Sequence, residues 1–459
     1  MSRHFDAIII GAGQAGPPLA GRLTGAGMSV ALIERHLFGG TCVNTGCMPT
    51  KTLVASAYAA HLVQRAADYG IMLDALPRVD MARMKARADA VSAKARAGVE
   101  NWLRSMKGCT VIKGHARFEA PDTVSVGEER LTAPRIFIDV GGRAVVPPLP
   151  GVDKVPYLTN TSMLALDRLP EHLVIVGGSY IGLEFGQMYR RFGAEVTIVE
   201  MQQRLVPRED EDVSQAIGEI LEGEGITMRL SAECIRLAPH PDGVAVAVEC
   251  VSGDPETVGS HVLLAVGRRP NTDDLGLDKA GIETDSRGYI QVDDFLATGV
   301  PGIWALGECN GRGAFTHTAY NDFEIVAANL LDGEGRKVSE RILGYALYID
   351  PPLGRVGMTD SQARASGRPL LGGHRPMSRV GRAVEKGETQ GFMKAVVDAE
   401  TRMILGATIL GISGDEAIHG ILDIMNAGVP YTTLQRAVPI HPTVSELIPT
   451  LLGEMQPFR

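Results

Sequence analysis

The chain of 459 residues contains one sequence unit twice, and this repeat restricts its fold more than any other feature. Ile8 to Glu34 align without a gap on Val174 to Glu200, at an offset of 166 residues. In each copy, a β-branched run predicts a buried parallel strand. A glycine turn follows, then an amphipathic helical stretch that ends near Gly27 or Gly193, and a second apolar strand that ends on an acid. The repeat therefore predicts an α/β chain with two doubly wound units.

Each turn has the residue types that a dinucleotide requires. Glycine lets the backbone approach a pyrophosphate, the next helix N-terminus offers unpaired N–H groups, and the closing acid accepts hydrogen bonds from a ribose. The residues are Gly11, Gly13, Gly16 and the acid Glu34 in the first copy, and Gly177, Ser179, Gly182 and the acid Glu200 in the second, where the glycine pattern is imperfect. One such pattern is weak evidence, because any tight turn between strand and helix gives one. Two patterns in register predict that the protein binds two dinucleotides.

The acid of the second copy bears on the choice between NADH and NADPH. Glu200 at the end of its strand would repel a 2′-phosphate, which favours NADH. Three arginines close in sequence, Arg190, Arg191 and Arg204, oppose that preference. The other interpretation is that Glu200 is a solvated carboxylate with no role in binding. The preference for NADH is therefore slight.

Composition and charge exclude several classes of protein. The chain has 45 basic and 54 acidic side chains and no dense basic run, so we expect no nucleic-acid partner. No apolar run reaches the eighteen or so residues of a membrane span, and the apolar stretch 7–12 is too short for a signal peptide. Six scattered cysteines do not form a secreted disulfide framework. We expect a cytoplasmic protein with no membrane contact.

Two of the cysteines, Cys42 and Cys47, lie close together in the segment GGTCVNTGCMPTK, residues 39–51. On an ideal helix their side chains would point about 140° apart, so a bond between them requires an irregular turn, and we expect the regular helix to begin near Pro49. So short a loop gives a structural disulfide only roughly 2 kcal/mol. A pair beside a helix start, where the dipole lowers a thiol's pKa, is typical of a dithiol that cycles with its disulfide.

Two other interpretations of the pair stay open. The two residues could be unrelated buried cysteines, or they could form half of a metal site. A metal site needs two more ligands, and His36 is the only candidate nearby. We expect no metal.

The cysteine segment resembles the redox-active signature of the class I pyridine nucleotide-disulfide oxidoreductases, which include glutathione reductase, dihydrolipoamide dehydrogenase and mercuric reductase. The resemblance extends over essentially the whole chain, through motifs that follow the family's order: GHARF (114–118), IDVGGR (138–143), LLAVGRRPN (263–271), IWALGE (303–308), FTHTAYND (315–322) and HPTVSE (441–446).

The resemblance implies two Rossmann-like domains that bind FAD and NAD(P), and a C-terminal α+β dimerisation domain. The expected ranges are 1–145 for the first part of the FAD domain, 146–270 for the NAD(P) domain, 271–340 for a return segment of the FAD domain, and 341–459 for the dimerisation domain.

The resemblance also implies which residues contact the cofactors. The implied FAD contacts are Gly11, Gly13, Gly16, Glu34, Gly40, Thr41, Gly114, Ala116, Gly307, Glu308 and Thr318. The implied contacts of the nicotinamide nucleotide are Gly177, Gly182 and Glu200, and Gly267 is a further cofactor contact. The family usually has Gly-Asp where this chain has Gly307-Glu308, so we expect a slight shift of the backbone there.

The catalytic residues implied by the resemblance form three pairs. Cys47 is the thiolate beside the flavin, and Cys42 is the thiol that meets the substrate. An ion pair beside the flavin ring consists of Lys51 and Glu184. The acid/base is His441, with Glu446 to hold its ring. In the family this last pair reaches the cysteines of the other subunit, so we expect a homodimer.

We therefore expect an enzyme that passes electrons from NAD(P)H through FAD and the cysteine pair to a disulfide or a small oxidised acceptor such as hypothiocyanous acid. Alternatives are a mercuric or cupric ion reductase, a dihydrolipoamide dehydrogenase and, in another class, a non-catalytic redox sensor. The segments TKTL, SYIGLE and GRGAFTH are closest to the mercuric-reductase-like branch, but the final residues LLGEMQPFR lack the vicinal cysteines that Hg(II) needs. The other cysteines, Cys109, Cys234, Cys250 and Cys309, are expected to be bystanders.

Overall fold

Each copy of the repeat forms the centre of its own parallel sheet in the computed structural model, which describes residues 2–75, 78–249 and 255–458. The first sheet has the order β18-β8-β2-β3-β4. Its strands are β2 (Ala7–Ile10), β3 (Val30–Glu34), β4 (Cys109–Lys113), β8 (Ile136–Ile138) and β18 (Ile303–Ala305). Helix α1 (Gly16–Gly25) follows the first glycine turn, and α8 (Thr316–Ala327) packs beside it.

The second sheet repeats this arrangement in the order β12-β11-β10-β16. Its elements are β10 (His172–Val176), α6 (Tyr180–Phe192), β11 (Glu195–Val199), α7 (Glu211–Gly223), β12 (Thr227–Arg229) and β16 (His261–Leu264). The two central strand pairs have the same register: Ala7 lies opposite Val30 in the first sheet, and Leu173 lies opposite Val196 in the second. The offset found in the sequence is therefore also the offset of the structure.

Smaller sheets complete the two nucleotide units. A four-stranded sheet of order β1-β7-β6-β5 lies at the N-terminal end, a three-stranded antiparallel sheet accompanies the second unit, and one strand pair joins the two units. Their bounds are β1 (Ser2–His4), β5 (Ala116–Ala120), β6 (Thr123–Val126), β7 (Glu129–Thr132), β13 (Glu233–His240), β14 (Gly243–Glu249), β15 (Glu256–Gly259), β9 (Gly142–Ala144) and β17 (Arg268–Pro270).

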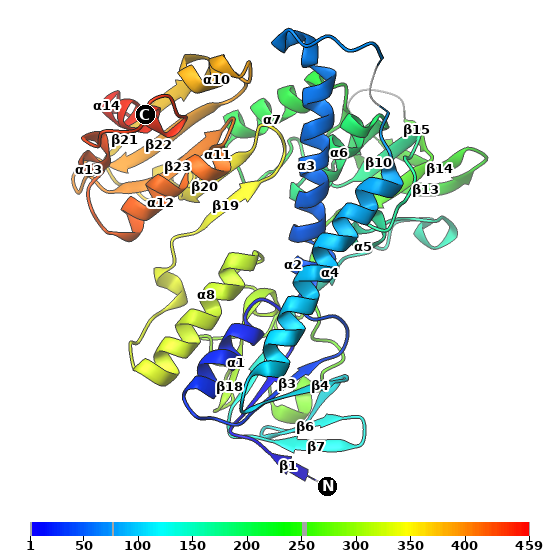
Figure 1. Cartoon of the computed structure of the whole chain (residues 1–459), viewed down its shortest axis with the longest axis vertical. Coiled ribbons are helices and arrows are strands. Elements are labelled where there is room, and N and C mark those ends of the chain that lie inside the picture. Colours follow the sequence, from blue (N-terminus) through cyan, green and yellow to red (C-terminus); the bar gives the residue numbers. More distant parts are fainter. Residues whose placement is uncertain (1, 76–77, 250–254, 459) are drawn as a thin grey trace.

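The C-terminal part is a six-stranded antiparallel sheet with short helices, and it forms a third lobe in Figure 1. Its strands are β19 (Gly344–Leu347), β20 (Leu353–Gly357), β21 (Leu370–Pro376), β22 (Phe392–Asp398), β23 (Ile404–Leu410) and β24 (Gln456–Pro457). Its helices are α9 (Asp360–Ala365), α10 (Gly381–Glu385), α11 (Gly414–Ala417), α12 (His419–Asn426), α13 (Thr432–Gln435) and α14 (Ile448–Gly453). Two doubly wound units and an α+β C-terminal part confirm the predicted fold class.

The helices after the first unit connect the lobes (Figure 1). They are α2 (Gly40–Asn44), α3 (Cys47–Gln64) and α4 (Met81–Ser105), and a one-turn helix α5 (Asn160–Met163) opens the second unit. Helix α3 begins at Cys47, two residues before the predicted start at Pro49. Proline permits this, because a residue in the first turn has no intrahelical partner for its N–H group in any case.

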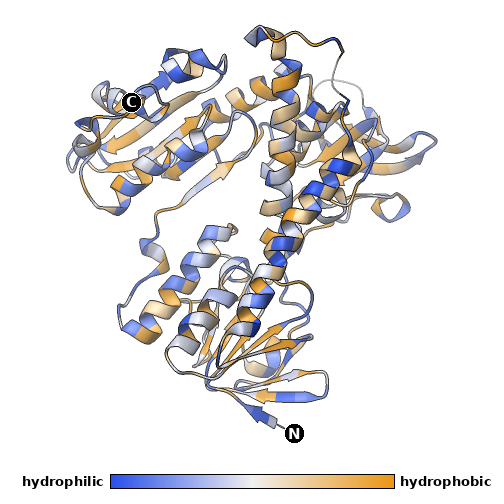
Figure 2. Cartoon of the chain, in the orientation of Figure 1, coloured by the Kyte–Doolittle hydropathy of each residue, from blue (hydrophilic) through white to orange (hydrophobic). Residues whose placement is uncertain are grey.

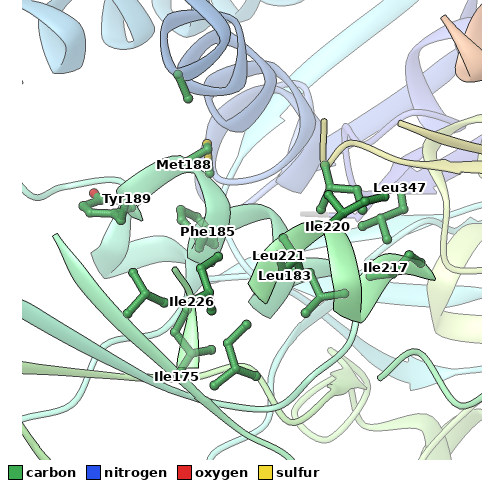
Figure 3. Close-up of a cluster of buried hydrophobic side chains, with 14 of the residues drawn as sticks. Ile175, Leu183, Phe185, Met188, Tyr189, Ile217, Ile220, Leu221, Ile226 and Leu347 are labelled. Atoms are coloured by element: carbon green, nitrogen blue, oxygen red, sulfur yellow. The ribbon is translucent and has the colours of Figure 1, made fainter. Parts of the chain in front are cut away.

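One hydrophobic core is shared by three parts of the chain. Figure 3 shows side chains of α6 and α7 packed on Ile175 of β10, with Leu347 of β19 at the same cluster. Leu53 and Ala57 of α3 also belong to it. The helix that carries Cys47 is therefore packed against both the second unit and the third lobe.

Hydropathy differs between the sheets and the long helix α4. Figure 2 shows the parallel strands as mainly hydrophobic and α4 as hydrophilic over much of its length, as expected of a solvated helix. Within the described residues, no helix combines the length and apolar character needed to cross a membrane.

A buried ion cluster fixes the second unit to the third lobe. Lys394 of β22 lies 3.1 Å from Asp210, 2.8 Å from Asp212 and 2.8 Å from Asp360, and only 6% of its side chain is exposed. Burial opposes ionisation of Asp210, yet N–H groups from Asp360 and Ser361 and the charge of Lys394 lower its pKa to about 2. Its contribution to stability is therefore present above its ordinary pKa and is lost only as the pH falls through about 2.

Replacement of Lys394 tests this connection. Lys394→Met removes the buried cation that Asp210, Asp212 and Asp360 share, so we expect the free energy of unfolding to fall by about 3–5 kcal/mol. The matched control is Lys279→Met, which removes a half-exposed lysine with one partner, Glu119, at 3.1 Å, and costs at most about 1 kcal/mol. Urea denaturation measures both. Equal losses in the two variants would contradict a special role for the buried cluster.

Candidate active site

The acids that close the two repeat units hold their glycine turns in the same way. Glu34 accepts hydrogen bonds from the N–H groups of Ala12 at 2.9 Å and His36 at 2.7 Å. At the positions 166 residues later, Glu200 accepts from the N–H groups of Gly178 at 2.6 Å and Gln202 at 2.8 Å. Each carboxylate thus stands at the mouth of its turn, where it can also accept from a ribose.

Glycine is required where these turns pass other backbone. Gly11 has a φ of +109°, and a Cβ atom there would lie 2.1 Å from the carbonyl oxygen of Asp139. A Cβ atom at Gly16 would lie 2.3 Å from the carbonyl oxygen of Gly11. The same conflicts recur at Gly177 and Gly182. Only glycine therefore permits these close approaches.

A cavity of about 510 Å³ joins the first glycine turn to the cysteine pair. The predicted site residues that line it are Gly11, Gly13, Glu34, Gly40, Thr41, Cys42, Cys47, Gly114, Ala116 and Glu308. Gly16 and Gly307 lie behind this lining. An acid for a ribose at one end, a glycine turn at a helix N-terminus and two sulfur atoms at the other end fit a flavin dinucleotide.

The cysteine pair spans the irregular turn that the sequence predicts. Cys42 lies in α2, the chain turns through Thr45 and Gly46, and Cys47 is the first residue of α3. A Cβ atom at Gly46 would lie 2.9 Å from the carbonyl oxygen of Thr41. Both cysteines carry free thiols, and Cys47 is exposed where it faces the cavity.

The two sulfur atoms differ in acidity. The hydrogen bond from the Cys42 thiol is the main reason that the pKa of Cys47 falls to about 6; burial opposes this, and a hydrogen bond from Thr316 and the charge of Lys51 assist it. The hydroxyl of Thr316 lies 3.3 Å from the Cys47 sulfur. The same hydrogen bond and burial raise the pKa of Cys42. Of the two sulfur atoms, Cys47 is therefore the more acidic.

An ion pair beside the cysteines joins the two nucleotide units. Lys51 of α3 lies 2.6 Å from Glu184 of α6, and only 7% of the Glu184 side chain is exposed. The other carboxylate oxygen of Glu184 accepts the N–H of Tyr348 at 3.1 Å, and Lys51 lies 4.6 Å from the centre of the Tyr348 ring. Lys51 thus adds positive charge near Cys47, which the charge of Glu184 partly offsets, and the pair fixes α3 against α6.

His441 and Glu446 form the predicted pair but do not line this cavity. The Nδ1 atom of His441 lies 2.8 Å from the Glu446 carboxylate, and 81% of the histidine side chain is exposed. Nearby Val438 and Ile440 are 97% and 79% exposed. The imidazole is therefore oriented by its own chain, and it lies outside the lining of the cavity that holds its own cysteines.

Two predicted FAD contacts have other partners. Both oxygens of Glu308 pair with Arg268, at 2.6 and 2.9 Å, although Glu308 still lines the cavity. The Thr318 hydroxyl donates to the carbonyl of Phe315 at 2.7 Å and accepts its N–H at 3.1 Å. Thr318 thus caps α8 and does not face the cavity.

Sequence reasoning did not single out Thr316, Arg268 or Asp139, all of which line the cavity. Each belongs to a motif that the sequence displays, FTHTAYND, LLAVGRRPN or IDVGGR. The signal in the sequence that could have identified these three residues is their position at a strand end or a helix start. Only the tertiary fold brings them to the cysteines and the glycine turn.

The arginines near Glu200 have other partners. Arg191 is buried and pairs with Glu224 at 2.7 Å and Asp350 at 2.6 Å. Arg190 donates to the carbonyl of Glu224 at 2.7 Å. The third, Arg204, donates to the carbonyl of Pro207 at 3.2 Å.

Gly267, a further predicted cofactor contact, follows β16 with a φ of +131° and does not line the cavity.

The other described cysteines, Cys109, Cys234 and Cys309, are free thiols that do not line the cavity. Cys309 is fully buried, its thiol donates to the carbonyls of Ile138 and Leu306, and burial raises its pKa. Burial also raises the pKa of Cys109 to about 11. Cys250 lies outside the described residues.

Two family descriptions match this chain. Residues 5–322 match "Pyridine nucleotide-disulphide oxidoreductase", and residues 344–452 match the dimerisation domain of the same family. Together they cover most of the sequence.

Curated relatives cover nearly the whole chain. The "Probable pyridine nucleotide-disulfide oxidoreductase RclA" of Escherichia coli strain K12 is 37% identical over 98% of this chain and 99% of its own length. A dihydrolipoyl dehydrogenase of Thermus scotoductus is 33% identical over 97% of this chain and 96% of its own length. A mercuric reductase of Bacillus cereus is 32% identical over 96% of this chain and 70% of its own length.

Solved structures agree with these relatives. A structure of the HOCl-induced flavoprotein disulfide reductase RclA from Escherichia coli has a TM-score of 0.88 and 36% identity, over 98% of this chain and 99% of that chain. A Cu(II) complex of the same protein has a TM-score of 0.89 at the same identity and coverage.

The contact between Thr316 and Cys47 predicts a change in thiol acidity. Thr316→Val removes a hydrogen bond to the thiolate, so we expect the pKa of Cys47 to rise by roughly one pH unit. The pH dependence of alkylation of Cys47 by iodoacetamide, followed by mass spectrometry of the reduced protein, measures it. The exposed Thr433 provides the control, Thr433→Val, which leaves the profile unchanged. An unchanged profile for Thr316→Val would show that the hydroxyl does not stabilise the thiolate.

Proposed function

Because the chain belongs to the pyridine nucleotide-disulphide oxidoreductases, and is therefore a flavoprotein disulfide reductase, we propose that it passes electrons from NAD(P)H to a disulfide or a small oxidised, thiol-reactive acceptor such as hypothiocyanous acid. The family consists of enzymes, so a non-catalytic redox sensor has no support. The observation that carries the proposal is the single cavity that the first glycine turn, Cys42 and Cys47 share.

The residues of the cavity divide between binding and chemistry. Gly11, Gly13, Glu34, Gly40 and Thr41 would hold FAD, since they supply a close backbone approach and a ribose acceptor. When bound, FAD accepts a hydride from the reduced nicotinamide and supplies two electrons to the disulfide.

The acidity of the two sulfur atoms suggests the order of events in the reduced pair. The thiol of Cys42 loses its proton and attacks one sulfur of the acceptor disulfide; the other sulfur leaves as a thiolate and takes up a proton. The thiolate of Cys47 then attacks Cys42, which releases the second acceptor sulfur as a thiolate and restores the bond between the two cysteines. Because its pKa is raised, Cys42 needs a base at the first step.

We assign that base to His441 of a second copy of the chain. Its imidazole is oriented by Glu446, is almost fully exposed, and stands beside the exposed apolar residues Val438 and Ile440. Exposed apolar side chains at such a position favour contact with another chain. The match of residues 344–452 to a dimerisation domain supports a homodimer with the active site shared between subunits.

A purified heterodimer tests this arrangement. When Cys42→Ser and His441→Ala chains with different tags are paired, one site carries both defects and the other is intact. We expect the heterodimer to show about half of the wild-type rate of disulfide reduction, while each mutant homodimer loses at least about 100-fold.

A heterodimer of Cys42→Ser with wild type is the control, and it also retains about half. If His441 served the cysteines of its own chain, the mixed heterodimer would be as inactive as the two homodimers. FAD absorbance of each preparation shows that the cofactor site is retained.

Reduction of Cu(II) is the second candidate, because solved structures of the similar RclA are Cu(II) complexes. Delivery of an electron to Cu(II) requires no proton transfer to the acceptor. The His441→Ala homodimer therefore separates the two functions: it loses disulfide reduction under either hypothesis, and it retains NAD(P)H-driven Cu(II) reduction if the metal ion is the acceptor.

We propose that NADH is the preferred donor, since Glu200 stands at the second turn and all three neighbouring arginines have other partners. Glu200→Gln removes the charge that would repel a 2′-phosphate. We expect the ratio of kcat/KM for NADH to that for NADPH to fall about tenfold or more. Arg204→Gln is the control, and it leaves the ratio within about twofold. A ratio unchanged by Glu200→Gln would contradict this assignment.

A further inference from the structure

Asp139 is a buried carboxyl group at the first glycine turn, and it takes no part in the proposed reduction of a disulfide. It follows β8, its N–H donates to the carbonyl of Ile10 at 2.8 Å, and only 6% of the residue is exposed. Its side chain accepts the N–H of Gly16 at 2.8 Å and hydrogen-bonds the N–H of Ala15. The carboxyl group thus occupies the start of α1, and Asp139 lines the cavity.

The repeat provides an internal comparison for this residue. In the second unit the corresponding backbone position is Ala265, whose N–H donates to the carbonyl of Val176 at 2.8 Å and whose carbonyl faces Gly177. The second turn therefore adopts the same geometry with a methyl group in place of the carboxyl group. The carboxyl group of Asp139 is not needed to build the turn.

The charges around Asp139 disfavour its ionised form. The titratable groups that face it are Glu34 at the end of β3, Asp322 in α8 and the thiol of Cys309 in the short turn 307–310. Burial is the main cause that raises the pKa of Asp139 to about 8; the N–H groups of Gly16 and Ala15 oppose the rise, and the two acids add to it.

A pyrophosphate held at this turn would share the cavity with Asp139, which lines it. The N–H groups at a helix start attract an anion, but here a carboxyl oxygen already occupies the N–H of Gly16. A carboxylate would place a further negative charge beside the phosphates, whereas a neutral acid adds none and can donate a hydrogen bond to a phosphate oxygen.

We propose that the protonation state of Asp139 controls how tightly the chain holds FAD: the neutral acid permits tight binding at the glycine turn, and the carboxylate weakens it. The proposal rests on the FAD site assigned above. Binding of FAD then requires a proton on Asp139, so affinity is full at pH values where the acid is neutral and falls as the pH rises through about 8.

Titration of the apo chain with FAD tests this directly, with flavin fluorescence as the readout and neither NADH nor an acceptor present. Between pH 6 and 9.5, we expect the dissociation constant of the wild type to approach a tenfold rise per pH unit above pH 8. Asp139→Asn keeps the shape without the charge, and it should abolish this rise and bind FAD at least about tenfold more tightly than wild type at pH 9.5.

Two further variants sharpen the test. Asp139→Ala reproduces the arrangement at Ala265 and should give the same flat profile as Asp139→Asn. Glu128→Gln removes an exposed acid of the same lobe and should keep the wild-type slope. A flat wild-type profile, or a wild-type slope that persists in both Asp139 variants, would overturn the proposal.

If an Asp139 variant folds poorly, thermal unfolding of the apo chain provides a second test. Because the pKa of Asp139 is raised above its ordinary value, wild-type stability should decline as the pH rises from about 4 to 8, and Asp139→Asn should lessen that decline. Equal declines in the two proteins would count against a buried neutral acid. Failure to bind FAD at any pH would instead remove the FAD site itself, so the two failures are distinguishable.

Discussion

In each nucleotide unit the glycine turn passes so close to the backbone of the neighbouring strand that no side chain fits between them. This contact fixes the start of α1 against the end of β8, and the start of α6 against the end of β16. The cavity depends on it, because the turn forms the cavity's wall and sets where Glu34 can meet a ligand. The same turn also positions the cysteine segment, because Gly40 of α2 packs on Gly13.

The sequence predicted those features that depend on local pattern. The repeat predicted the parallel strands of both units, and it predicted that Glu34 and Glu200 have the same place in each unit, because strand, glycine turn and helix are all contained within residues 8–34 and 174–200. The matching register of the two central strand pairs came from the structure. The family resemblance extended this to the C-terminal α+β part. The predicted ion pair of Lys51 with Glu184 and the pair of His441 with Glu446 are both present as contacts.

Features that depend on distant segments were not predicted. Thr316 reaches Cys47 across 269 residues, and Asp139 reaches Gly16 across 123, so neither contact has a spacing that a sequence pattern can express. The ion pair of Glu308 with Arg268 likewise depends on the strand pair β9–β17 that joins the two units. The start of α3 was misplaced by two residues because proline was treated as the first helical residue, while the helix accepts it anywhere in its first turn.

Helix α3 links the cysteine pair to the hydrophobic core of the protein. Its first residue is Cys47, Lys51 follows one turn later, and Leu53 and Ala57 lie in the core that the second unit and the third lobe share. Electron transfer tolerates far less displacement than folding does, because the sulfur must keep its distance and its hydrogen bonds. Substitutions in the interior of this protein that leave the melting temperature intact can therefore still uncouple donor from acceptor.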